Sequence, residues 1–93
     1  MLVTEKMRTL IETLTKEEIS ITCAAINSFG EQVSGETGYP IANEHELPYF
    51  QPHFVADCLD TCVLSKRAKP QWNSMLASLH TKFWQLAQEL KGG

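Results

Sequence analysis

The segment PQWNSMLASLHTKFWQLAQELK, residues 70–91, indicates the fold more strongly than any other part of the sequence. Its large apolar residues recur at alternating spacings of four and three, a heptad seam typical of an amphipathic α-helix. The seam consists of Trp72, Leu76, Leu79, Phe83, Leu86 and Leu90, and it is flanked by Met75, His80, Trp84 and Ala87. This apolar arc covers about half of the helix circumference, which one facing helix cannot cover. We therefore expect the helix to be central to a bundle or to be shared with a second subunit.

A second helix has a clear N-terminal signal. In the run Thr15-Lys16-Glu17-Glu18, the Thr15 hydroxyl can accept from the Glu18 amide and the Glu18 carboxylate can bond back to Thr15, which is a capping box. Leu14 and Ile19 are spaced as a hydrophobic staple around this cap. Gly35 and Gly38 are the expected terminators. The apolar face then contains Ile19, Thr22, Ile26, Phe29 and Val33.

A further helix is expected at the start of the chain, over residues 4–13. Arg8 is spaced to form an ion pair with Glu5 or with Glu12 on the polar face of this helix. The apolar face contains Met7, Leu10, Ile11 and Leu14.

The remaining helix is expected to begin near Pro52, whose fixed φ suits a first turn. Asp57 and Asp60 lie on its polar face. Because Pro70 follows so soon after this helix, the last helix either doubles back as a hairpin or continues with a bend. The apolar face contains Phe54, Val55, Cys58, Leu59, Cys62 and Val63.

These patterns predict an all-α fold: a small four-helix arrangement with one long connection, rich in proline and aromatic residues, between the second and third helices. The 93 residues are expected to form a single domain over 1–93, with a thin core that oligomerisation would enlarge. The N-terminus meets charge at once, which argues against a secretory signal. No apolar run is long enough to span a bilayer, so we expect no membrane association. Three cysteines form no closed disulfide framework, which favours reduced thiols and a cytoplasmic location.

The connection between the second and third helices, about residues 35–51, is the candidate binding segment. Residues 38–54 contain half of the aromatic residues of the chain, three of its four prolines and two of its three histidines. Long ordered loops are often functional, and aromatic side chains commonly anchor interfaces. Two alternatives stay open: the aromatic residues bind a partner, or they fold inward as a lid over the core. They are Tyr39, Tyr49 and Phe50.

A metal site is the alternative chemical interpretation. His45 and His53 with nearby carboxylates such as Glu44 offer nitrogen and oxygen ligands that zinc accepts. Their spacing matches no established zinc pattern, and Cys58 and Cys62 lie on an apolar face where free cysteine packs as a small hydrophobe. We therefore predict no metal and no cofactor.

Enzymatic and nucleic-acid-binding functions are disfavoured. No nucleophile elbow, phosphate-binding glycine-rich loop or paired-carboxylate motif accompanies the histidines. The cations Lys66, Arg67 and Lys69 are a small footprint on an otherwise acidic chain, which would repel phosphate.

The sequence thus predicts a non-enzymatic protein-interaction or regulatory module, such as an adaptor, a regulatory subunit or a protein inhibitor. From Glu17 to Asp60 the chain has no Lys or Arg, and from Lys66 onward the balance is basic, so the two halves could pair across a two-fold axis. We expect a homodimer through the last helix and a second, unidentified protein partner. The predicted partner-binding residues are Tyr39, Glu44, Glu46, Tyr49, Phe50 and Trp84.

Overall fold

The computed structural model describes residues 3–37, 41–66 and 69–92, and these residues form helices and no strand. This confirms the all-α class and the four α-helices. None of the described helices is both long and apolar enough to cross a membrane. The helices are α1 (Val3–Glu12), α2 (Lys16–Ser34), α3 (Pro52–Ser65) and α4 (Asn73–Gly92), with the short 3-10 helices η1 (Leu47–Tyr49) and η2 (Pro70–Trp72).

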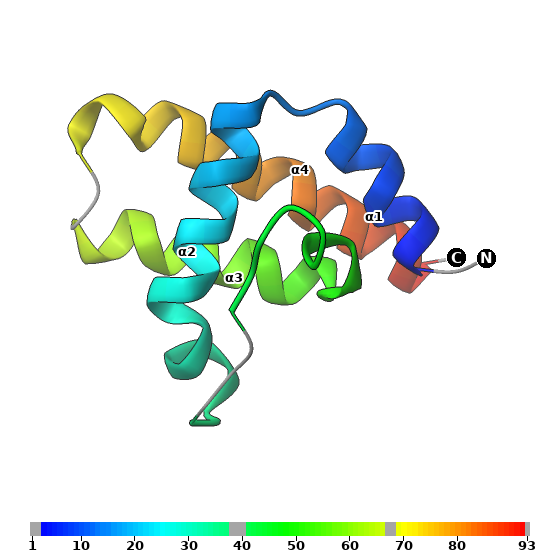
Figure 1. The fold of residues 1–93 in the computed structure, drawn as a ribbon, viewed down its shortest axis with the longest axis horizontal. Helices are drawn as coiled ribbons and strands as arrows, with labels where there is room; N and C mark the ends of the chain where they lie inside the picture. Colours follow the sequence, from blue (N-terminus) through cyan, green and yellow to red (C-terminus); the bar gives the residue numbers. More distant parts are fainter. Residues whose placement is uncertain (1–2, 38–40, 67–68, 93) are drawn as a thin grey trace.

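The two C-terminal helices, α3 and α4, form an antiparallel hairpin with the most extensive helix contact in the molecule (Figure 1). At the corner Lys66 adopts the left-handed conformation, with φ 59°, and its N–H donates to the Val63 carbonyl at 3.3 Å. Pro70 then occupies the start of η2, where its missing N–H costs nothing. Of the two alternatives at Pro70, the chain therefore doubles back.

Helix α2 crosses the α3–α4 hairpin steeply rather than running alongside it (Figure 1). Its predicted capping box is confirmed: the Glu18 N–H donates to Thr15 Oγ1 at 3.1 Å, and the Thr15 N–H donates to Glu18 Oε1 at 2.9 Å. The helix ends as expected at Gly35, whose φ of 76° favours glycine. Gly38, the other expected terminator, lies outside the described residues.

The wide apolar arc of α4 is covered mostly within the chain, because α4 contacts α1, α2 and α3. Trp72 and Leu90, at the two ends of the seam, are partly buried. Trp84 remains 50% exposed. The central position in a bundle therefore accounts for most of the arc, and Trp84 is its main uncovered part. The fully covered part of the seam consists of Leu76, Leu79, Phe83 and Leu86.

The long connection contains one short helical turn: η1 covers Leu47–Tyr49, and Pro48 lies inside it. Proline is tolerated there because the first residues of a short 3-10 helix need no intrahelical N–H donor. The connection then joins directly to α3 at Pro52, the expected start.

Candidate protein-interaction loop

The described part of the connection, residues 41–51, is fastened to α2 by Asn27. The Asn27 amide donates to the Ala42 carbonyl at 3.0 Å, and its Oδ1 accepts from the Ala42 N–H at 2.6 Å. Ala42 is buried, so both of its backbone polar groups would otherwise lack a partner away from water. This pair of hydrogen bonds fixes the entry of the loop on the outer side of α2.

A tight turn follows at Asn43. Its Oδ1 accepts from the N–H groups of His45 and Glu46 at 2.9 and 3.0 Å, which is an Asx-type turn. The Asn43 carbonyl also accepts from the Leu47 N–H at 2.9 Å. These local bonds define the backbone of the segment that contains the acidic residues.

Beyond the turn, three of the next four residues of the loop are buried. Leu47 is fully buried, Pro48 is buried, and Phe50 is 9% exposed with its ring stacked on Phe54 at a centroid distance of 6.0 Å. Phe50, predicted as a partner-binding residue, is thus a core residue in this structure, and the lid alternative describes it. At Phe50 the backbone changes from η1 to the extended conformation, with ψ 146°, and its ring lies against Phe54 of α3.

Tyr49 points outward from the same short segment. Its side chain is 63% exposed, and its hydroxyl accepts from Arg8 Nη2 at 3.1 Å. The Arg8 guanidinium lies 5.8 Å from the Tyr49 ring centroid, a distance compatible with a cation–π contact. Arg8, expected to pair with a carboxylate of its own helix, instead connects α1 to the loop.

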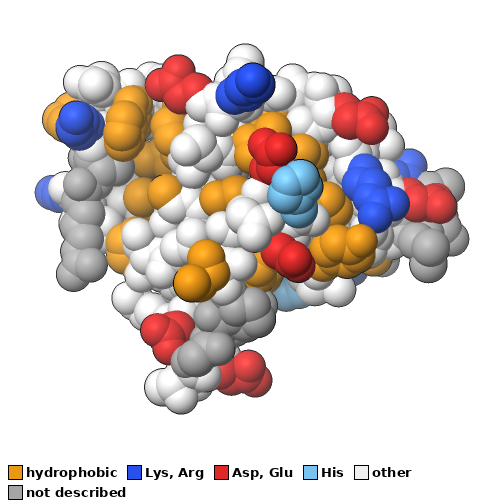
Figure 2. Space-filling model, viewed as in Figure 1, with side chains coloured by type: hydrophobic (Ala, Val, Ile, Leu, Met, Phe, Trp, Pro, Cys, Tyr) orange, Lys and Arg blue, Asp and Glu red, His pale blue; other side chains and the backbone are white. Residues whose placement is uncertain are grey.

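The remaining predicted loop residues lie at the surface. Glu44, His45 and Glu46 are exposed around the turn, and Ile41 is 76% exposed at the start of the described loop. Tyr39 lies outside the described residues. Figure 2 shows the face that includes the loop, where acidic and basic side chains are interspersed and apolar side chains form small separate patches. The loop is therefore one of several small features on a mixed surface.

The two candidate metal-binding histidines are not brought together. His45 lines a hollow with Glu44 beside α2, whereas His53 lines another hollow between the start of α3 and the end of α4. Within residues 3–37, 41–66 and 69–92, no group of three or more His, Cys, Asp or Glu side chains could hold a metal ion.

The thiols are free, and burial keeps them protonated. Burial raises the pKa of Cys58, which is fully covered, to about 12, with a smaller contribution from the Asp57 charge. Burial also raises the pKa of Cys62, and burial together with the Glu44 charge raises that of Cys23. Because the thiolate is the nucleophilic form, none of these groups is activated for catalysis.

Trp84 and His80 lie on α4, away from the loop sequence. His80 Nδ1 lies 2.9 Å from the Ala56 carbonyl of α3, and since a carbonyl only accepts, this nitrogen is the donor. The bond adds a polar link inside the hairpin. Trp84 remains a half-exposed indole.

Sequence reasoning missed three residues that build the loop: Arg8, Asn27 and Asn43. Asn43 was detectable in principle, because an asparagine before a short polar run is typical of a turn. Asn27 and Arg8 bond to residues 15 and 41 positions away, so no local pattern marks them.

Comparisons of the chain with protein-family models, with curated proteins and with solved structures gave no match. The functional assignment therefore rests on the residues described above.

Proposed function

We propose that this chain is a non-enzymatic protein-interaction module that binds a second protein through the loop at residues 41–49. The observation that carries the proposal is the exposure of Tyr49, 63%, on a segment whose neighbours Leu47, Pro48 and Phe50 are buried. A large aromatic side chain held outward on an anchored backbone is a suitable interface anchor.

Pre-organisation supports this interpretation. The Asn27 and Asn43 bonds and the buried anchors order the loop before a partner arrives, so binding loses less conformational entropy. Arg8 further restricts the Tyr49 ring through the hydroxyl bond. A fixed tyrosine and arginine pair offers the partner an apolar surface together with hydrogen-bond donors.

Glu44 and Glu46 supply the charge of the proposed surface. Both are exposed on the turn next to Tyr49 in sequence. They favour a partner that presents Lys or Arg around an apolar pocket, since opposite charges raise the association rate and fix the orientation. An adaptor, a regulatory subunit and a protein inhibitor all match this description. We place this activity in the cytoplasm, where the three thiols would stay reduced.

The test is a quantitative comparison of proteins that co-purify from the native host with the wild-type chain and with Tyr49→Ala. A true partner is recovered with the wild type and reduced at least about tenfold with the variant, because interface hot spots contribute roughly 2 kcal/mol or more. Gln32→Ala, an exposed change on α2, is the matched control and leaves recovery unchanged. Each captured protein is then purified, and its affinity for the wild type, for Tyr49→Ala and for Gln32→Ala is measured directly.

Two further variants refine the result. Tyr49→Phe retains the ring but loses the Arg8 bond, so it separates ring packing from orientation. Glu46→Lys is expected to slow association with a basic partner. If every captured protein binds Tyr49→Ala as tightly as wild type, the loop is not the binding surface.

A further inference from the structure

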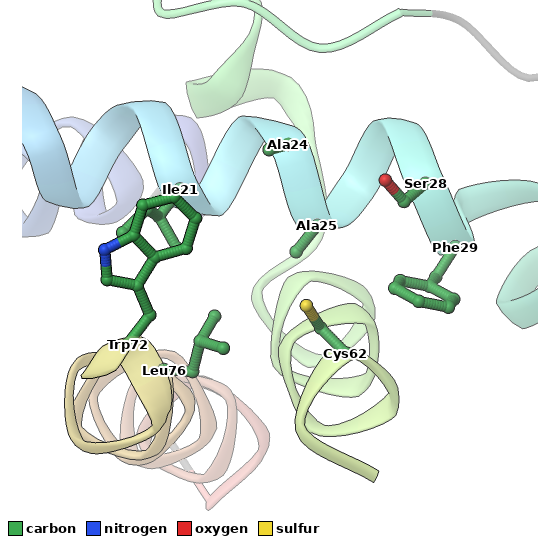
Figure 3. A pocket seen from close by; sticks show the side chains of 8 residues that line it. All are labelled: Ile21, Ala24, Ala25, Ser28, Phe29, Cys62, Trp72 and Leu76. Carbon is green, nitrogen blue, oxygen red and sulfur yellow. The ribbon is translucent and has the colours of Figure 1, made fainter. Parts of the chain in front are cut away.

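A second surface feature lies on the other side of α2, at the corner between α3 and α4. It is a half-open cleft of about 180 Å³ that neither Tyr49 nor the acidic turn lines (Figure 3). Its lining comes from three parts of the chain, α2, α3 and the η2–α4 junction. The lining residues are Ile21, Ala24, Ala25, Ser28, Phe29, Cys62, Trp72 and Leu76.

The cleft exists because small residues of α2 face two separated helix ends. In Figure 3 α2 passes across α3 and α4, which are seen nearly end-on; Trp72 rises toward Ile21, and Cys62 points toward α2 near Ala25. Ala25 and the exposed rim residues Ala24 and Ser28 are too short to fill the space between them. The walls are mostly apolar, and Ser28 contributes a hydroxyl group.

The volume matches one large apolar side chain. A buried apolar cavity of about 150 Å³ accepts a benzene molecule, whereas sites for drug-sized ligands occupy about 300–1,000 Å³. A half-open cleft of 180 Å³ is therefore too small for an extended small molecule and suits a single leucine, phenylalanine or similar group projecting from a larger partner.

The α3–α4 side of the mouth is positively charged. Lys69 Nζ lies 5.5 Å from the centroid of the Trp72 ring, which is itself a wall of the cleft. Lys66, also exposed, caps α3 one turn after Cys62. On α2 the nearest carboxylates along the chain are Glu18, three residues before Ile21 and paired with Lys82, and Glu31, two residues after Phe29. Carboxylates of a partner would thus meet Lys66 and Lys69.

We propose that this cleft binds one large apolar side chain from an acidic segment of a partner protein, independently of the loop at residues 41–49. The apolar group would pack between Trp72 and Cys62, and flanking carboxylates would lie against Lys66 and Lys69. The proposal goes beyond the loop function, because the residues proposed for that function, Tyr49, Glu44 and Glu46, do not line the cleft.

The probe is the capped peptide Glu-Glu-Leu-Glu-Glu, titrated into the full chain carrying Trp84→Phe so that Trp72 is the sole indole. We expect saturable changes in Trp72 emission and amide shifts confined to the cleft. Replacing the central Leu by Ala weakens binding by about tenfold, as expected for a buried leucine side chain. The peptide Lys-Lys-Leu-Lys-Lys binds more weakly, and added salt weakens the acidic peptide.

Matched variants separate the cleft from the loop and from the fold. Ala24→Trp fills the cleft from its exposed rim and abolishes binding, while Ala77→Trp, the same change at an exposed position of α4, leaves it unchanged. Tyr49→Ala also leaves it unchanged. Lys69→Glu reverses the preference between the acidic and basic peptides without touching the core.

Three results would overturn the proposal. The first is the absence of saturable binding of the acidic peptide. The second is free indole or cyclohexanol binding as tightly as the peptide, which would make the cleft a small-molecule site. The third is self-association of the wild type that Ala24→Trp removes, which would make a second copy of this chain the occupant.

Discussion

Asn27 has the largest expected effect on the loop of any single polar residue. It supplies a donor and an acceptor to the two backbone groups of the buried residue Ala42. Asn27→Ala leaves both groups without their partner, at a cost of about 1–3 kcal/mol in the free energy of unfolding. Asn27→Asp retains the acceptor for the Ala42 N–H but places a carboxylate oxygen against the Ala42 carbonyl, so it is also destabilising. Urea denaturation measures both effects.

Gln32→Ala is the control for this prediction, since Gln32 is an exposed residue of the same helix. Limited proteolysis of the loop provides a second readout, because loss of the Asn27 bonds exposes residues 41–46 to cleavage while the helices remain. Equal stability and equal cleavage of wild type and Asn27→Ala would show that the loop is held by its apolar anchors alone.

Because of Cys58, the free energy of unfolding is expected to decrease at alkaline pH. Its folded pKa is raised by burial to about 12 from an ordinary value of 9.0. Below pH 9 the thiol is protonated in both states and its contribution is constant; above pH 9 the unfolded chain loses this proton and the folded chain retains it. The free energy of unfolding therefore falls as pH rises, by about 1.4 kcal/mol at one pH unit above the unfolded value.

The measurement compares wild type and Cys58→Ala at about pH 8 and about pH 10. Cys58→Ala is less stable than wild type at both pH values because it loses packing in the core. However, its free energy of unfolding decreases less than that of wild type between the lower and the higher pH. The difference between the two pH effects isolates Cys58 from tyrosine and lysine titration. Identical losses in the two proteins would contradict the assigned burial of the thiol.

At the scale of elements, Glu18 joins the start of α2 to α4. Its carboxylate completes the capping box with Thr15 and lies 3.5 Å from Lys82 Nζ. The Thr15 N–H bond, and then the Lys82 charge, lower the pKa of Glu18 below its ordinary value of 4.5. The stabilisation is thus fully present above pH 4.5 and is lost as pH falls through the lower folded value.

Glu18→Gln retains an acceptor for the cap and removes the ion pair, so its cost is about 0.2–1 kcal/mol. Thr15→Ala removes the cap itself and costs about 0.5–2 kcal/mol. A double-mutant cycle with Lys82→Gln isolates the pair, and Glu17→Gln, in the same turn, is the control. Chemical denaturation at neutral and at acidic pH then shows a reduced acid dependence for Glu18→Gln and an unchanged one for Glu17→Gln.

The loop both covers the core and presents an exposed surface, and substitutions at two adjacent residues separate these two roles. Phe50→Ala removes a buried ring stacked on Phe54 and is expected to cost about 3–5 kcal/mol. Tyr49→Ala removes an exposed ring and its Arg8 contact, at a cost of about 1 kcal/mol or less. Thermal melting distinguishes them; similar melting temperatures would mean that the two rings are buried alike.

This loop also shows how far sequence could predict the structure. The helices and the Thr15 cap were predictable because their signals are local, within a few residues. The opposite orientation of Tyr49 and Phe50 depends on the backbone at the end of η1, and on Arg8 and Asn27, which are distant in sequence. Residue type alone therefore predicted the same role for Tyr49 and Phe50, whereas in the fold Tyr49 is exposed and Phe50 is buried.

For the whole molecule, the charge asymmetry of the sequence is partly used inside the chain. Lys82 from the basic half pairs with Glu18 from the acidic half, and Lys6 of α1 lies 3.6 Å from Glu89 of α4. These bridges connect α4 to α2 and to α1 across the bundle. An intersubunit role for the remaining charges, such as Lys91 and Asp60, stays a prediction.

Homodimerisation through α4 is the remaining question at this scale, and Phe83 and Trp84 test it. Phe83 is fully buried, so Phe83→Asp places an unpaired charge in the core and unfolds a domain whose stability is about 5–15 kcal/mol. Trp84 is 50% exposed, so Trp84→Asp retains the helical circular dichroism and the cooperative melting. If α4 forms a dimer, this variant weakens it, because a charge replaces the largest exposed apolar group of the helix.

Sedimentation velocity at several micromolar concentrations measures the assembly of wild type, Trp84→Asp and the control Gln85→Asp on the same helix. A dimer that Trp84→Asp and Gln85→Asp weaken equally would place the contact elsewhere on α4, and a wild-type monomer throughout would leave Trp84 to the second protein partner.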